Sequence, residues 1–137
     1  MERPIHEGLS RRPSSGHCLD GAELSVRLHI SDTPDPTPTL PTQLQQLTTK
    51  VVAPARCADA GQSAGEICTD NPNRTDGPGG GDSGGPAVKY VRGVPQLVGG
   101  CSRAATQYAG VGPTVYTSSP YFRSWIYDTA RGVPAAT

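Results

Sequence analysis

The residue best placed to do chemistry in this sequence is Ser83, which stands in the segment Gly81-Asp82-Ser83-Gly84-Gly85-Pro86. A serine hydroxyl attacks a carbonyl carbon when a general base lies within hydrogen-bond reach. Acyl transfer also needs backbone N–H groups that point at the developing oxyanion, and glycines on both sides of the serine permit that geometry. Residues 82–85 alone would more often be a polar turn, but the glycines upstream make the setting much more specific. The segment is therefore compatible with acyl transfer, a reaction in which a serine hydroxyl such as that of Ser83 would be the attacking group.

This segment resembles the active-site signature of the trypsin/chymotrypsin family of serine proteases, and the resemblance covers roughly residues 43–132. The resemblance implies that Ser83 attacks the scissile carbonyl, that the amides of Gly81 and Ser83 form the oxyanion hole, and that no cofactor or metal takes part. Further stretches carry it: the entry to the family's second barrel (43–57), the strand lining the substrate cleft (96–102), the strand behind the specificity pocket (113–117) and the terminal helix (121–131).

The resemblance also offers a general base. Of the three histidines, only His17 directly precedes a cysteine and stands upstream of a strand-like segment, as the family's catalytic histidine does. We therefore expect His17 to act as the base, although a lone histidine is more often a surface residue. The stretch in which the family carries its aspartate has no counterpart here. Asp32 and Asp35 lie in a proline-rich segment without the shelter that an orienting aspartate needs, so we predict no catalytic aspartate.

The aspartate before the nucleophile, Asp82, poses a separate problem. In the family that the segment resembles, this carboxylate is buried against the N-terminal amine that zymogen cleavage creates. No apolar, glycine-containing activation sequence stands near the start of this chain, and Arg12-Pro13 is a poor substitute. Because burial of an unpaired carboxylate is costly, we expect the loop to stay zymogen-like, with an unformed oxyanion hole, or to leave Asp82 in water.

A substrate pocket follows from the same resemblance. Its floor, six positions before the serine, falls on Gly77, and a shift of one residue in this loop would place Asp76 there instead. Ser102 belongs to the cleft strand, while Ala104 and Thr114 would form the walls, with Thr114 narrowing the pocket. A floor without a carboxylate does not suit arginine or lysine. We therefore expect a preference for small or medium apolar side chains.

The cysteines divide into a pair and two single residues. Cys57 and Cys68 are eleven residues apart in a turn-rich stretch, which suits a small disulfide loop, and they match the disulfide of the family's intermediate loop. Cys101 lies in a predicted interior strand, where a small buried side chain is more common than a reactive thiol. A bond between Cys18 and Cys101 remains an open alternative.

The elements that must position these residues are short strands. Residues 23–30 alternate apolar and polar, which predicts a half-buried strand, and residues 43–53 have a similar character. Apolar residues at helical spacing from Tyr121, with Gly132 as the stop, predict one C-terminal helix. Turn signals between the strands indicate an all-β barrel or sandwich. Further strand-sized runs lie at 66–69, 86–90, 96–99 and 114–117.

These patterns and the resemblance divide the chain into four parts. Residues 1–16 are polar and without periodicity, which predicts a disordered segment. We expect residues 17–30 to be a remnant of the family's first barrel, residues 31–42 a proline-rich linker, and residues 43–137 the C-terminal barrel with its helix. The fold class is therefore all-β: a trypsin-like second β-barrel of Greek-key type with a C-terminal α-helix, the first barrel being truncated to a remnant.

Composition excludes some classes of partner. Twelve basic and twelve acidic residues balance to zero net charge without a basic patch, so we expect no nucleic acid. No apolar run approaches the length of a membrane span, so we expect no membrane. The first twelve residues lack the apolar stretch of a secretory signal, and secretion is expected from the family alone. The oligomeric state is not determined by these features.

The function that these observations favour is that of a serine-type endopeptidase acting on peptide or protein substrates, with activity impaired in this chain. Two alternatives stay open. The chain could be a non-catalytic remnant, or pseudoenzyme, that keeps a binding cleft. It could also be a half-barrel that complements a separately encoded first half, in which case a barrel face would be exposed in the isolated chain.

Overall fold

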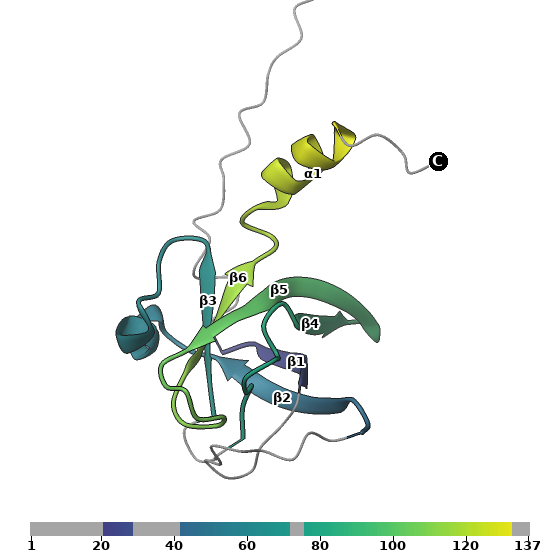
Figure 1. Ribbon diagram of the computed structural model, residues 1–137. Coiled ribbons are helices and arrows are strands. Elements are labelled where there is room, and N and C mark those ends of the chain that lie inside the picture. Colours follow the sequence, from purple (N-terminus) through teal and green to yellow (C-terminus); the bar gives the residue numbers. More distant parts are fainter. Residues whose placement is uncertain (1–20, 29–41, 72–75, 133–137) are drawn as a thin grey trace, which may run out of the picture.

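A computed structural model describes residues 21–28, 42–71 and 76–132, and in them six antiparallel strands form a closed barrel (Figure 1). Around the barrel the strands follow one another in the order β1-β2-β3-β6-β5-β4. Strand β3 thus lies beside β6 while β4, β5 and β6 are consecutive neighbours, which is a Greek-key arrangement. The predicted all-β barrel of Greek-key type with a C-terminal α-helix is confirmed. The strands are β1 (Glu23–Leu28), β2 (Gln45–Val51), β3 (Glu66–Asp70), β4 (Pro86–Val91), β5 (Val94–Ala104) and β6 (Thr114–Ser118).

The core follows from the two-residue period of the strands. In β2 the side chains of Leu47, Thr49 and Val51 are buried while their neighbours are not, because successive side chains of a strand point to opposite faces. Thr49 and Thr69 are buried polar residues among this apolar lining. The barrel is therefore filled by one face of each strand. The main buried cluster consists of Leu24, Val26, Leu47, Val51, Ile67, Ala87, Val98, Cys101 and Tyr116.

Strand β1 has a different place from the one expected. Over its full length it pairs with β2, and on its other side Ser25 and Val26 pair with Val88 and Ala87 of β4. It therefore closes the same barrel that holds the other five strands, and Glu23–Leu28 is not a remnant of a separate barrel. The expectation was wrong because one strand's alternation shows that it is half-buried but does not show which sheet it joins. Residues 1–20 and 29–41 lie outside the described part, so the expected disordered segment and most of the linker are untested.

Strand β5 is longer than the apolar run at 96–99 predicted. It extends over eleven residues because it pairs with β4 along its first part and with β6 along its second. The turn before it has Arg92 at φ 51° and Gly93 at φ 78°. Two consecutive positive φ angles are the signature of a type I′ hairpin turn, whose twist matches that of the flanking strands. Strand β5 therefore extends from this hairpin turn to the loop that contains Ser83.

The predicted disulfide is confirmed. Cys57 and Cys68 are bonded, with their Cα atoms 5.8 Å apart. Cys57 lies in a 3-10 helix, η1 (Pro54–Ala60), that the sequence analysis did not predict, although a proline in the first turn of a helix is a recognised signal. Both cysteines belong to a second buried cluster with Ala60 and Val115. The bond therefore fastens η1 to the outside of the barrel wall.

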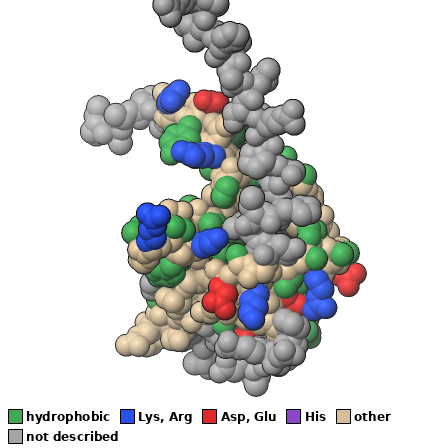
Figure 2. Space-filling view, turned by 180° about the vertical axis from the view of Figure 1, so that it is seen from behind, with side chains coloured by type: hydrophobic (Ala, Val, Ile, Leu, Met, Phe, Trp, Pro, Cys, Tyr) green, Lys and Arg blue, Asp and Glu red, His purple; other side chains and the backbone are tan. Residues whose placement is uncertain are grey.

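The predicted C-terminal helix is α1 (Arg123–Arg131), and it ends before Gly132 as expected. It stands away from the strands (Figure 1), and none of its residues is buried. Trp125 and Ile126 are among its exposed side chains. On the opposite view, hydrophobic side chains appear at the surface, and basic and acidic side chains are intermixed over the barrel (Figure 2). No helix in the described ranges is long and apolar enough to span a membrane.

The role of β1 in closing the barrel gives a stability prediction. Leu24→Ala removes a side chain that is 1% exposed, so the free energy of unfolding should fall by about 3 kcal/mol through lost burial and the cavity left behind. Leu44→Ala is the matched control, because Leu44 is 66% exposed, and it should change the value by less than about 0.5 kcal/mol. Urea unfolding measures both. Equal effects of the two variants would contradict the assignment of β1 to this barrel.

The disulfide gives a second prediction. Replacing both Cys57 and Cys68 by alanine should lower the free energy of unfolding by about 3 kcal/mol, since the bond closes a loop of eleven residues in the unfolded chain. The comparison is with Cys101→Ala, which leaves the bond intact. If reduction with dithiothreitol destabilises the double variant as much as the parent chain, the stabilisation does not come from this bond.

Candidate active site

Ser83 lies in a tight loop that leads into β4. Gly81 and Gly84 flank it with φ angles of 100° and 82°, which side chains other than glycine rarely adopt. A Cβ atom at either glycine would meet nothing within 4 Å, so the backbone conformation and not the available space requires glycine there. The Gly85 amide donates to the Asp82 carbonyl at 2.9 Å and closes the turn around the serine. The side chain of Ser83 is presented at the surface.

Two hydrogen bonds fasten this loop to β5. The Gly84 amide donates to the carbonyl of Cys101 at 2.7 Å, and the Cys101 amide donates to the carbonyl of Gly85 at 2.9 Å. A pair of bonds in opposite directions fixes both the position and the orientation of the loop on the strand. Ser83 is therefore held beside the part of β5 that follows Cys101.

Asp82 is inside the loop and not in water. It is 5% exposed, and its Oδ2 atom accepts a hydrogen bond from the Gly79 amide at 2.8 Å. One of the two outcomes that we expected, a carboxylate left in solvent, is therefore wrong. The argument for an unformed oxyanion hole assumed that a buried Asp82 would have no partner, and the loop's own backbone supplies one.

The amides of Gly81 and Ser83 are not used by the fold. Within the described ranges neither amide donates to a protein acceptor. Amides without a protein acceptor are one requirement of an oxyanion hole.

The structure brings four of the expected site residues together around one pocket. Ser83 lies at its edge, and Ser102, Ala104 and Thr114 line it. The pocket has a volume of about 300 Å³, enough for one side chain of a peptide but small for a separate ligand. Its other lining residues are Pro78, Gly79, Gly80, Cys101, Arg103, Thr106 and Gln107.

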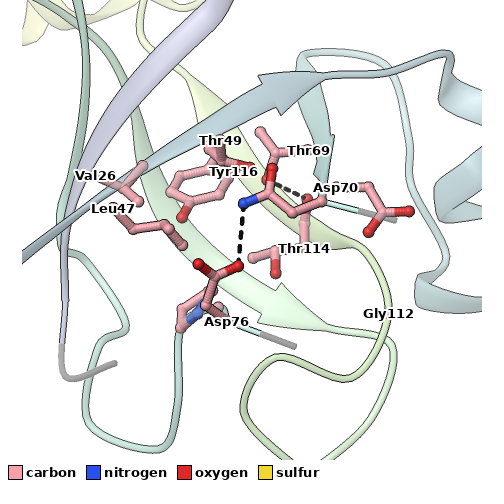
Figure 3. Close-up of a pocket in the computed structure, with 12 residues that line it drawn as sticks. Val26, Leu47, Thr49, Thr69, Asp70, Asp76, Gly112, Thr114 and Tyr116 are labelled. Carbon is pink, nitrogen blue, oxygen red and sulfur yellow. Dashed lines mark hydrogen bonds between the residues drawn. The ribbon is translucent and has the colours of Figure 1, made fainter. Parts of the chain in front are cut away.

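Gly77, the expected floor, does not line this pocket. Together with Asp76 it lines a second cavity of about 10 Å³ inside the barrel, and Asp76 is turned toward Asn71, whose Nδ2 donates to it at 3.4 Å (Figure 3). Pro78 and Thr114 contact both spaces and therefore separate them. The alternative with Asp76 on the pocket floor is not realised in this geometry either.

Cys101 is the second nucleophilic side chain at the pocket. It is a free thiol and buried, and Cys18, the partner that the sequence analysis left open, lies outside the described residues. Burial, and after it the charge of Asp82, raises the pKa of the Cys101 thiol to about 11. The thiol therefore stays protonated and unreactive at neutral pH. The buried hydroxyl of Tyr116 interacts with this thiol, and burial likewise raises the pKa of Tyr116.

Arg103 is a pocket residue that the sequence analysis missed. It forms an ion pair with Glu66 at the start of β3, with an Nη1–Oε1 distance of 2.7 Å. It also donates to the carbonyls of Ala60 and Gly61 at the end of η1. No local sequence pattern indicates these contacts, because Glu66 is 37 residues away along the chain.

The general base cannot be placed in this geometry. All three histidines, including His17, lie outside the described residues. Within the described part no group of acidic, cysteine or histidine side chains could hold a metal ion. The described site thus consists of an exposed serine in a glycine-rich loop, the two amides of that loop and a pocket.

Comparison with known proteins agrees with this geometry. The family model Trypsin matches residues 20–126, more than half of the chain. The solved structure described as "Structure of GrC" is similar, with a TM-score of 0.67 and 27% identical residues, over 88% of this chain and 51% of the other. This chain thus spans about half the length of that protein. No curated protein matches. The closed barrel, the glycine-flanked serine and the family match lead to one conclusion: the chain belongs to the trypsin family of serine proteases.

Proposed function

We propose that this chain carries serine endopeptidase chemistry with Ser83 as the nucleophile. The observation that supports this most directly is the place of Ser83: exposed, flanked by two positive-φ glycines, and at the edge of a pocket of side-chain size. The substrate would be a peptide or protein, whose side chain enters the pocket while its carbonyl lies over the serine. The disulfide between Cys57 and Cys68 favours a secreted protein, because such bonds persist in oxidising compartments.

The proposed reaction proceeds in two transfers. The Oγ atom of Ser83 forms a bond to the scissile carbonyl carbon, and the amides of Gly81 and Ser83 donate to the oxyanion. The C–N bond then breaks, and the amine leaves with the proton that the base took from Ser83. Water attacks the acyl-enzyme, the acid product leaves, and the proton returns to the serine. Each step needs a base within hydrogen-bond reach of Oγ.

His17 is the proposed base. It stands six residues before β1, and because β1 belongs to the described barrel, the expected context of a first-barrel remnant no longer supports this role. The second candidate function therefore has a specific observation in its favour: the described barrel corresponds to about half of a protein of this family and holds no histidine. In that case the chain binds peptides without cleaving them, or it is active only with a base supplied from outside the barrel.

The first test is covalent labelling of Ser83. A fluorophosphonate should form a bond between Oγ and phosphorus as the P–F bond breaks and fluoride leaves, with the proton passing to the base. Labelling of the full chain, measured by intact mass, should be abolished by Ser83→Ala. Cys101→Ser is the control and should label like the parent chain, since the thiol is protonated at neutral pH. Labelling that survives Ser83→Ala would place the nucleophile elsewhere, and no labelling at all would favour the non-catalytic alternative.

The second test concerns the base. His17→Ala should reduce the labelling rate about a hundredfold or more, since general bases typically contribute factors of that order. His6→Ala is the matched control and should leave the rate unchanged. If both variants label alike, the base is not His17.

A further inference from the structure

Arg103 is the one cationic side chain among the described residues that line the pocket beside Ser83. An arginine in a substrate pocket ordinarily suggests recognition of a carboxylate, because its guanidinium group can bind one through two parallel hydrogen bonds. The hydrogen bonds that Arg103 already makes point to a different role.

The guanidinium of Arg103 is saturated. Its nitrogens donate five hydrogen bonds, as many as a guanidinium has N–H groups. Two go to the carboxylate of Glu66, at 2.7 and 2.9 Å, and one to Ser102 Oγ at 3.3 Å. The remaining two go to the carbonyls of Ala60 and Gly61, both at 2.7 Å. A substrate carboxylate could bind only by displacing one of these acceptors.

The Arg103–Glu66 pair, of which Arg103 lines the pocket, is also electrically neutral. Glu66 has a side chain that is 14% exposed, and its two oxygens face the guanidinium. The carboxylate of Asp76 lies in the separate small cavity behind Pro78 and Thr114, and that of Asp82 is buried and accepts a hydrogen bond from the Gly79 amide. The other lining residues are uncharged. Neither an acidic nor a basic side chain in the pocket would therefore meet an unpaired opposite charge.

The same contacts hold the pocket wall in place. The pairing of β5 with β6 shifts its register between Cys101 and Arg103, and such a bulge turns side chains away from their regular alternation. Arg103 then reaches Ala60 and Gly61, which lie in the segment closed by the disulfide. The wall formed by Ser102 to Ala104 is thereby joined to a segment that is itself fixed to the barrel.

We propose that Arg103 determines substrate preference as a positioning residue: it neutralises Glu66 and braces the pocket wall, so that the pocket takes an uncharged side chain. The inference rests on the proposed function and deepens it by naming the class of residue at the cleavage site. Removal of the arginine should therefore create a preference for basic side chains and not merely abolish one for acidic side chains.

The test compares peptide diphenyl phosphonates that differ only in a valine-, glutamate- or lysine-like side chain. Ser83 Oγ forms a bond to phosphorus as the base takes the hydroxyl proton, a P–O bond breaks, and the phenoxide leaves as phenol once the base has passed that proton to it. The full-length parent, Arg103→Gln, Glu66→Gln and the double variant are compared by labelling rate over probe concentration, which separates binding from the bonding step.

The parent chain should label fastest with the valine-like probe. Arg103→Gln leaves Glu66 unpaired and should raise the preference for the lysine-like over the glutamate-like probe by roughly three- to tenfold, seen in the binding constant. Glu66→Gln should shift the preference in the opposite direction, and the double variant should restore the parent's order. A purely structural role would slow all three probes together. Fastest labelling of the parent by the glutamate-like probe, or unchanged ratios in Arg103→Gln, would overturn the proposal.

Two measurements, peptide binding and acid stability, test the proposed role of Arg103 without requiring catalysis. If no probe labels the chain, the proposed function fails, and peptides ending in valine, glutamate or lysine are titrated by calorimetry into Ser83→Ala and its Arg103→Gln counterpart. The same order of preference, with the same shift, supports the proposal, whereas equal binding or no binding contradicts it.

The second readout is acid stability. Hydrogen bonding from Arg103, assisted by the Ser63 amide and hydroxyl and opposed by burial, lowers the pKa of Glu66 from 4.5 to about 2. The pair therefore stabilises the fold above pH 4.5, and this contribution disappears as the pH falls toward 2. The gap in melting temperature between the parent and Glu66→Gln should narrow over that range, and a gap that stays constant would contradict the ion pair.

Discussion

The two opposed hydrogen bonds between the Ser83 loop and the Cys101 position of β5 are the interaction on which the rest of the site depends. Without them the loop would be an exposed glycine-rich turn with many accessible conformations. With them, the serine and the pocket wall belong to one rigid unit, because the same strand provides both the anchor and the wall. The position of Ser83 relative to the pocket therefore depends on contacts between backbone groups and not on contacts between side chains.

Barrel closure supplies the rigidity that this contact requires. The Ser83 loop ends where β4 begins, and β4 pairs with β5 on one side and with β1 on the other. An open edge at β4 would leave the loop attached to a strand with unpaired backbone groups. The short pairing of Ser25 and Val26 with β4 removes that edge. A strand near the start of the chain thus supports a loop some sixty residues later.

The charged side chains around the site are compensated by groups of the protein itself. Asp82 is buried, and the Gly79 amide is one of its hydrogen-bond partners. The guanidinium of Arg103 donates hydrogen bonds to Glu66, to Ser102 and to two backbone carbonyls. Burying a charge is tolerable when hydrogen bonds replace the lost water. Both charges therefore shape the loop and the pocket wall, while the pocket itself offers mostly backbone and small uncharged groups to a substrate. Because the charges are compensated within the protein and the pocket is left mostly uncharged, the fold favours the proposed preference for uncharged substrate side chains.

The sequence by itself determined the fold class and the disulfide, and it singled out Ser83 as the proposed nucleophile. The Ser83 segment, the cysteine spacing and the alternating strands are local patterns, and local patterns persist in the structure because backbone conformation and side-chain periodicity depend on near neighbours. The strand at 45–51 and the stop of α1 at Gly132 were predictable for the same reason.

Only the tertiary structure decided where β1 pairs, which residues line the pocket, and what Arg103 and Asp82 contact. Pairing partners and ion pairs join residues far apart in the chain, and many partners are compatible with one alternating strand or one charged residue. Gly77 was expected on the pocket floor because its position was counted along the loop from Ser83. Such a count does not show on which side of the pocket the loop passes. The physical reason is common to all these cases: they depend on closing the barrel, which is a property of the whole chain.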